Sequence, residues 1–175
     1  MECQLTGPGD AGRYPTEMDA EQQIDFLLRQ SGWYPSREAD YSSFEYVLER
    51  IGCVIDGKSK EFLRVNFGLK FRFLRGVVDV TLTEAIRSVG LWDITAMSKL
   101  MNSPVCMVGF VTDHTMYMTP SGIVGLCSYD WAYYSEYPST ESLYLILAGF
   151  ENGPPPVWIE NDSRPEDYRE ADDVA

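Results

Sequence analysis

The chain has 175 residues, of which 45% are hydrophobic and 13% aromatic, a composition that suits one globular domain and excludes a disordered protein. Its 27 acidic and 14 basic residues give a net charge of −13. The chain as a whole therefore lacks the positive charge with which nucleic-acid binders neutralise phosphates, and we expect no nucleic-acid partner. The charge favours a protein partner with a basic surface, or it serves only solubility.

The cysteines and the single histidine predict neither a metal site nor a cofactor. Cys3, Cys53, Cys106 and Cys127 lie far apart in apolar surroundings, and one histidine cannot complete a zinc site with them. Buried free thiols in a reducing compartment are expected. No signal-peptide pattern is present, and no apolar run approaches the roughly 18 residues that span a membrane. We expect a cytoplasmic protein without a membrane partner.

The first half of the chain is rich in helix signals. Residues 1–16 carry several Gly and Pro and predict a flexible N-terminal arm. Beyond them, capping residues and apolar spacings of 3, 4 and 7 predict successive helices. These run from after Thr16 to Gly32, from Ser42 or Ser43 to Ile51, and from Asp56 to Phe67.

The second half of the chain is rich in strand signals. Apolar and polar residues alternate in short runs separated by turn residues, which predicts an antiparallel meander. The expected strands are 69–73, 77–82, 105–111, 115–119 and 123–129, with helices at 82–100 (broken near Gly90) and 139–149. The aromatic residues 129–137 are expected to interrupt the meander. Residues 151–175 are proline-rich and then acidic, and predict a C-terminal tail on a domain of residues 17–150.

Two elements resemble a known family. Gly32, Trp33, Pro35 and Arg37 form a Gly-Trp-x-Pro-x-Arg pattern, and the helical run 41–51 and the segment 62–69 follow it. Together they resemble the SUKH superfamily, and within it the third subfamily of bacterial immunity proteins. The resemblance covers roughly residues 24–150. It implies an α+β fold with a twisted, mainly antiparallel sheet flanked by helices, and a non-enzymatic protein that neutralises a toxin by direct contact, with a basic nuclease-type effector as the expected partner.

The sequence also departs from this subfamily. Two consecutive glycines are usual after the third helix, whereas this chain has only Gly68 between Phe67 and Leu69. A second branch therefore stays open, namely SUKH-like proteins of large DNA viruses and adenoviruses. That branch implies binding to a host antiviral defence factor, in the host cytosol or nucleus instead of the bacterial cytosol.

The motif residues have two interpretations. Arg37 can contact a partner, or it can clamp the connector 33–40 to a carboxylate or to carbonyl groups, and we favour the clamp. Trp33 is likewise interpreted as a core residue. With Pro35, these side chains are expected to fasten the first helix to the second.

Signals of an active site are weak. His114 is the only histidine, and with Asp113 it lies in a predicted hairpin turn, where exposed polar residues are ordinary. Cys106 and Cys127 lie in apolar strands, an environment that raises the pKa of a thiol and makes it unreactive. The sequence has no phosphate-binding loop and no metalloprotease motif. We expect a protein that is not an enzyme.

Charge is distributed unevenly along the chain. Residues 58–75 carry a net charge of +5, whereas residues 100–163 carry seven acidic residues and no Lys or Arg. The basic stretch either pairs internally with acidic residues or polarises the surface. A third hypothesis, a nucleic-acid or nucleotide binder that uses residues 58–75, is the least favoured.

The acidic stretch contains the predicted partner-binding face. Tyrosine and tryptophan are favoured anchors of interfaces, and neighbouring carboxylates steer a basic partner towards them. The predicted residues are Asp113, Tyr129, Asp130, Trp131, Tyr133, Tyr134 and Glu136.

Overall fold

The computed structural model describes residues 18–88, 91–128 and 130–159. The elements in chain order are α1 (Ala20–Gln30), α2 (Ser42–Arg50), α3 (Gly57–Asn66), β1 (Lys70–Phe73), β2 (Gly76–Asp79), α4 (Thr83–Ser88), α5 (Leu91–Leu100), β3 (Cys106–Val111), β4 (His114–Met118), β5 (Val124–Ser128), β6 (Tyr133–Tyr137), α6 (Thr140–Leu147) and β7 (Val157–Trp158). The predicted arm, residues 1–16, lies outside the described part of the chain.

Helices α1 and α3 begin at residues whose side chains cap them. Asp19 accepts a hydrogen bond from the main-chain N–H of Gln22 at 2.9 Å, and the Gln22 side chain accepts one from the Asp19 N–H at 3.2 Å. This capping box starts α1 at Ala20, directly after the capping residues 16–19 that the sequence offers. Asp56 caps α3 in the same way, and Gly68, with φ of +82°, ends the turn that follows that helix. The helices predicted from residues 42 and 56 are confirmed, but the residue before α2 is Tyr41, which makes no capping hydrogen bond, and neither Ser42 nor Ser43 caps this helix.

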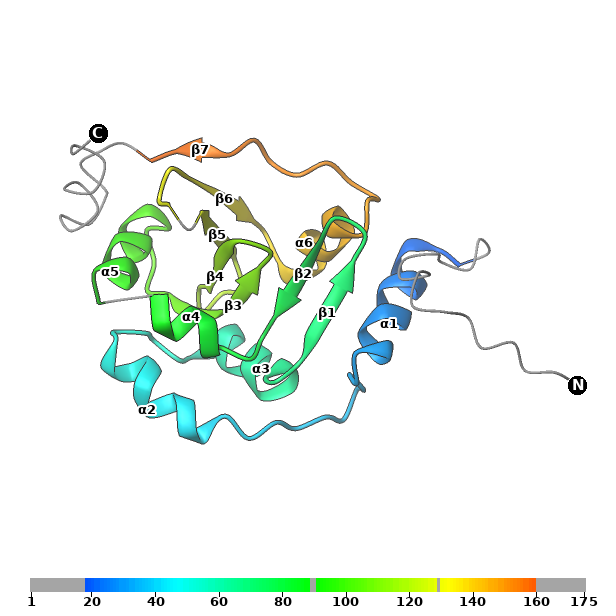
Figure 1. Cartoon of the computed structure of the whole chain (residues 1–175), viewed down its shortest axis with the longest axis horizontal. Coiled ribbons are helices and arrows are strands. Elements are labelled where there is room, and N and C mark those ends of the chain that lie inside the picture. The colour runs from blue at the N-terminus through cyan, green and yellow to red at the C-terminus, as the bar shows by residue number, and fades with distance from the viewer. Residues whose placement is uncertain (1–17, 89–90, 129, 160–175) are drawn as a thin grey trace, which may run out of the picture.

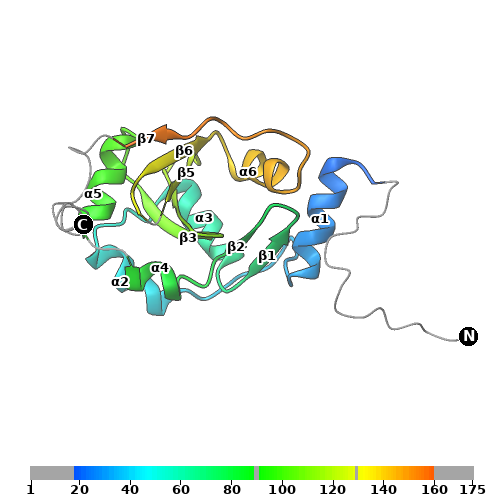
Figure 2. The same cartoon turned by 45° about the horizontal axis from the view of Figure 1, so that its top comes forward.

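The strands form one seven-stranded sheet in the order β1-β2-β3-β4-β5-β6-β7, in which every neighbouring pair is antiparallel. Each strand pairs with the next one in the sequence, which is a complete meander (Figure 1). Helices surround this sheet, with α1 beyond the β1 edge and α5 at the opposite end in both views (Figures 1 and 2). The protein therefore has the expected α+β fold with an antiparallel sheet flanked by helices.

The sheet is longer than the sequence predicts. Residues 129–137 were expected to interrupt the meander, but Tyr133–Tyr137 form β6, which pairs with β5 on one side and β7 on the other. Val157 and Trp158, in the predicted tail, form β7, the outermost strand at this end of the sheet. The prediction failed at β6 because tyrosines fill both its faces, so that apolar and polar residue types do not alternate along it.

The two faces of the sheet pack on different helices. On one face, the rings of Phe71 and Phe73 lie 6.0 Å and 5.1 Å from the ring of Tyr144 in α6. On the other face, Gly125 of β5 lies against Met97 and Met101 of α5, where a Cβ atom would come within 2.7 Å of the Met101 sulfur. The absence of a side chain at residue 125 lets α5 pack directly on the strand.

The connector after α1 is fixed by Arg37. Its guanidinium donates hydrogen bonds to the carbonyl oxygens of Val65 and Phe67, the latter at 2.7 Å. These carbonyls belong to the C-terminal end of α3, where the helix itself supplies no partners. The clamp interpretation is confirmed with carbonyl groups as acceptors. Its target is α3, however, and not the second helix.

Candidate functional site

One end of the sheet gathers polar and aromatic side chains from several strands. His114 of β4 lies opposite Ser128 of β5, the Tyr133 N–H of β6 donates to the Ser128 hydroxyl at 3.1 Å, and Tyr133 lies opposite Trp158 of β7. Because opposite residues of antiparallel strands share a face, these side chains form one row across the sheet. We call Asp113, His114, Tyr133 and Trp158 the edge cluster.

The edge cluster is connected by short contacts. The Nδ1 atom of His114 lies 2.7 Å from Oδ1 of Asp113, and its Nε2 atom lies 3.1 Å from the hydroxyl of Tyr133. The carboxylate only accepts, so Nδ1 carries the proton, and in the neutral ring the Tyr133 hydroxyl donates to Nε2. The ring of Trp158 packs edge-on against Tyr133, with centroids 5.7 Å apart. These contacts fix the orientation of every ring in the row.

Exposure is greatest at the two ends of the row. The Asp113 side chain is 74% exposed and Trp158 is 73% exposed, whereas the His114 side chain between them is 22% exposed. Catalytic triads also contain a carboxylate, an imidazole and a hydroxyl that are linked by hydrogen bonds. In this cluster an indole ring also packs against the phenol.

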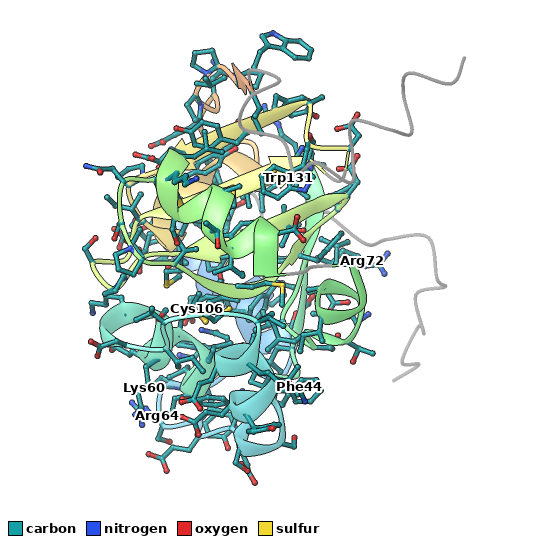
Figure 3. The ribbon with its side chains drawn as sticks, turned by 90° about the vertical axis from the view of Figure 1, so that its left-hand side faces the viewer. Phe44, Lys60, Arg64, Arg72, Cys106 and Trp131 are labelled. Atoms are coloured by element: carbon teal, nitrogen blue, oxygen red, sulfur yellow. The ribbon has the colours of Figure 1, made fainter. Side chains whose placement is uncertain are left out.

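The turn between β5 and β6 places two predicted site residues differently. Asp130 is exposed, and its carboxylate accepts a hydrogen bond from the Ala132 N–H at 3.1 Å. Trp131 has φ of +56° and is only 5% exposed, so its ring belongs to the core and offers no surface to a partner. Figure 3 shows Trp131 in the upper part of the molecule, far from Lys60 and Arg64. Tyr129 lies outside the described residues.

The remaining predicted residues lie on the other face of β6. Tyr134 is opposite Cys127 and Glu136 is opposite Gly125, the residue that α5 covers. Burial, and then the charge of Glu136, raises the pKa of Tyr134. The structure therefore divides the predicted face into two sides of one strand, with Asp113 and Tyr133 on one and Tyr134 and Glu136 on the other. Successive side chains along β6 point to opposite faces of the sheet, which separates these residues. Because β6 was not predicted, the sequence did not show this separation.

Sequence reasoning missed two members of the edge cluster. His114 was treated only as a possible catalytic residue, and Trp158 only as part of the predicted C-terminal tail. The available signal was the Val157-Trp158-Ile159 triplet, an apolar run among prolines and acidic residues. That triplet indicates a short strand, but its partner strand and register depend on the fold.

The basic stretch pairs with carboxylates. Lys58 lies 2.8 Å from Glu61, Arg64 lies 2.8 Å from Glu38, and Lys70 lies 2.5 Å from Asp79. Figure 3 places Lys60 and Arg64 at the bottom of the molecule and Arg72 on its flank. Internal pairing, one of the two alternatives, thus accounts for these three residues.

The cysteines are buried in the described part of the chain. The thiol of Cys53 accepts a hydrogen bond from the Met107 N–H at 3.3 Å and adjoins Cys106. The hydrogen bond to Cys53, and then burial, raises the pKa of Cys106, whereas the hydrogen bond from Cys106 lowers that of Cys53. Burial raises the pKa of Cys127. The expectation for Cys106 and Cys127 is confirmed, and the described residues contain no group of three or more potential metal ligands.

Comparison of the chain with protein-family models, with curated proteins and with solved structures yields no match. Within the described residues, every helix is too short or too polar to cross a lipid bilayer.

Proposed function

We propose that this protein is a non-enzymatic interaction protein of the SUKH type that neutralises a toxin by direct contact, and that the edge cluster is its contact surface. The proposal rests on the resemblance carried by Gly32, Trp33, Pro35 and Arg37 and on one structural observation. That observation is the row of oriented rings that ends in the exposed Trp158 on the last strand of the sheet.

The cluster has the properties of an interface centre. Exposed tryptophan and tyrosine supply large contact areas with few rotatable bonds, and they dominate the binding energy of many interfaces. Contacts with His114 and Tyr133 hold the rings in place before a partner arrives, which reduces the entropy cost of binding. Asp113 adds a negative charge beside them.

Charge and edge geometry indicate the kind of partner. The chain carries a net charge of −13, so it attracts a basic protein at long range, such as a nuclease that holds nucleic acid. Among the described strands, β7 pairs only with β6, and its other edge presents main-chain groups that an added strand can bind.

A site-specific crosslinker tests the proposal. A photoreactive phenylalanine analogue replaces Trp158 in one variant and Tyr46, a 67% exposed residue of α2, in a matched control. We expect a covalent complex with a basic protein from the native cell only at residue 158. The partner is then purified, and wild-type protein is expected to inhibit its activity, whereas Trp158→Ala inhibits it less. Equal crosslinking at both positions, or equal inhibition, contradicts the proposal.

The viral alternative uses the same surface. The single glycine at residue 68, where the bacterial subfamily usually has two, keeps this second branch open. The crosslinked protein distinguishes the branches, because a toxin encoded beside this gene supports an immunity role, and a host defence factor supports a viral antagonist.

A further inference from the structure

Two cysteines that are far apart in the sequence lie side by side in the fold. Cys53 belongs to the segment between α2 and α3, and Cys106 is the first residue of β3. On one side of Cys106, the carbonyl oxygen of Val105 accepts a hydrogen bond from the Val54 N–H at 3.0 Å. On its other side, the Met107 N–H donates to the Cys53 sulfur at 3.3 Å. We call Cys53 and Cys106 the thiol pair.

This arrangement suits a disulfide bond. Cysteines that form one have Cα atoms about 4.4–6.8 Å apart. Segments that share main-chain hydrogen bonds, as Val54 and Val105 do, run about 4.8 Å apart in a sheet. The Cys106 thiol also donates a hydrogen bond to the Cys53 sulfur, so the two side chains point towards each other. A bond between the sulfurs therefore requires little movement of the main chain.

Cys53 has the properties of the attacking thiol. Its sulfur accepts hydrogen bonds from the Met107 N–H and from the Cys106 thiol, and both donors stabilise a negative charge on it. The hydrogen bond from Cys106 lowers the pKa of Cys53 in spite of its burial. The thiolate is the reactive form of cysteine, so these donors favour reaction at Cys53 before Cys106.

The position of Cys53 near the surface has the same effect. Cys53 is 6% exposed, and the next residue, Val54, is 41% exposed, whereas Cys106 is fully buried. Residues 51–56 form neither helix nor strand, so this segment can open locally while the sheet stays folded. A small oxidant can then reach Cys53, and Cys106 needs to meet only the neighbouring sulfur.

We infer that the thiol pair is a redox-sensitive site at which a peroxide converts Cys53 and Cys106 into a disulfide. The Cys53 thiolate attacks one oxygen of hydrogen peroxide and the O–O bond breaks, which gives a sulfenic acid and a hydroxide that takes up a proton to become water. The Cys106 sulfur then attacks the sulfenic sulfur, and its thiol proton leaves with the hydroxyl group as a second water. The two thiols thus lose two electrons and two protons, and one peroxide is reduced to two waters.

The bond would tie the segment between α2 and α3 to the sheet, away from the edge cluster. Cys106 pairs with Met118 at one end of β4, whereas His114 of the edge cluster lies at the other end. Figure 3 shows Cys106 at mid-height in the molecule, below Trp131 of the β5–β6 turn. A crosslink between residues so far apart in the sequence restricts the unfolded chain and so stabilises the fold. This inference is independent of the proposed function.

Oxidation of the whole chain with hydrogen peroxide tests the inference. The reduced protein is treated with a small excess of peroxide, the remaining thiols are alkylated in urea, and the unreduced peptides are mapped by mass spectrometry. We expect one pair of peptides joined through Cys53 and Cys106, which dithiothreitol separates, and we expect Cys127 to be recovered as a thiol. Absence of this pair, or a major product that joins Cys53 to Cys3 or Cys127, overturns the inference.

Matched variants assign the effect on stability. Peroxide is expected to raise the melting temperature of the wild type by about 5–10 °C, and dithiothreitol should reverse the rise. Cys127→Ala leaves the thiol pair intact and should keep the full rise, whereas Cys53→Ala and Cys106→Ala should show none. Each variant is compared with its own reduced form, so a stability change caused by the substitution itself cancels. No rise in the wild type, or an equal rise in Cys106→Ala, contradicts the inference.

Discussion

The Nε2 atom of His114 lies 3.1 Å from the hydroxyl of Tyr133, although β5 separates their two strands in the sheet. A contact across an intervening strand bridges about 10 Å between strand axes, since neighbouring strands are about 4.8 Å apart. The small Ser128 lies between them in the row, which leaves room for the two rings to meet above it.

Because of this contact, the effects of substituting His114 and Tyr133 on the free energy of unfolding should not be additive. In a double-mutant cycle of His114→Ala and Tyr133→Phe, measured by urea unfolding, we expect a coupling free energy of about 0.5–1 kcal/mol. The control cycle combines His114→Ala with Tyr134→Phe, on the other face of β6, and should give no coupling. Equal coupling in both cycles would show that the hydrogen bond is not its source.

Arg37 is expected to be important for stability. Replacing it with Met removes charged hydrogen bonds to Val65 and Phe67 and leaves their carbonyls unsatisfied, so the free energy of unfolding should fall by about 2–4 kcal/mol. Arg72→Met is the control, because Arg72 is exposed on β1 and its loss should change stability by about 0.5 kcal/mol or less. Similar losses in the two variants would contradict the clamp.

Asp79 is expected to give a pH-dependent contribution. Burial raises the pKa of its carboxyl group, but hydrogen bonds from Lys70 and Thr81 outweigh burial and leave the pKa below its ordinary value. The stabilisation is therefore complete above the unfolded pKa of about 3.9 and is lost as the pH falls through the lower folded value. Asp79→Asn should cost about 1 kcal/mol at pH 7, with the difference from wild type shrinking below about pH 4. A difference that does not vary with pH would exclude an ionic origin.

Gly57 should tolerate no side chain. Its φ is +51°, and a Cβ atom would lie 2.4 Å from the carbonyl oxygen of Pro120. Gly57→Ala is expected to lower the free energy of unfolding by about 3 kcal/mol, because left-handed strain and a clash act together. At Gly153 the nearest atom to an added Cβ is 3.5 Å away, so Gly153→Ala should stay within about 0.5 kcal/mol of wild type.

The two faces of β6 should differ in partner binding. Asp113→Asn and Trp158→Ala are expected to weaken binding. Asp113→Asn should do so by slowing association, and its difference from wild type should shrink at high salt because salt screens the charge. Glu136→Gln and Tyr134→Phe, on the α5 side, should leave the association rate and affinity unchanged. Surface plasmon resonance with the partner identified by crosslinking measures both parameters. A larger loss from the Glu136 and Tyr134 variants would move the contact surface to the other face.

Most of the helices and the first strands could be predicted from the sequence because their signals lie within a few neighbouring residues. A capping residue and apolar spacing predict α3 from Asp56 onwards, and alternation between Lys70 and Phe73 predicts β1. β6 was not predicted because its apolar and polar residues do not alternate, although its two faces differ in burial. The pairing of β7 with β6 could not be predicted either, because the whole sheet determines the partner of a two-residue strand.

The candidate site was predictable only as a region. Asp113 and Tyr133 were identified, but Trp131 was grouped with them although the turn at φ of +56° directs it into the core. A tryptophan between polar residues reads equally well as a surface anchor or a core residue. Only the backbone at that residue distinguishes the two.

The short strand β7 also protects the rest of the sheet. Val157 and Trp158 pair with Tyr134 and Tyr133, and so they cover the outer hydrogen-bonding edge of the first two residues of β6. A chain cut after Gly153 would expose that edge at Tyr133 and Tyr134, and an open aromatic strand can pair with another copy of the chain. Proteolysis between the sheet and its last strand would therefore remove Trp158 and at the same time favour self-association, so a nicked protein would be lost as aggregate and would not persist as an inactive monomer.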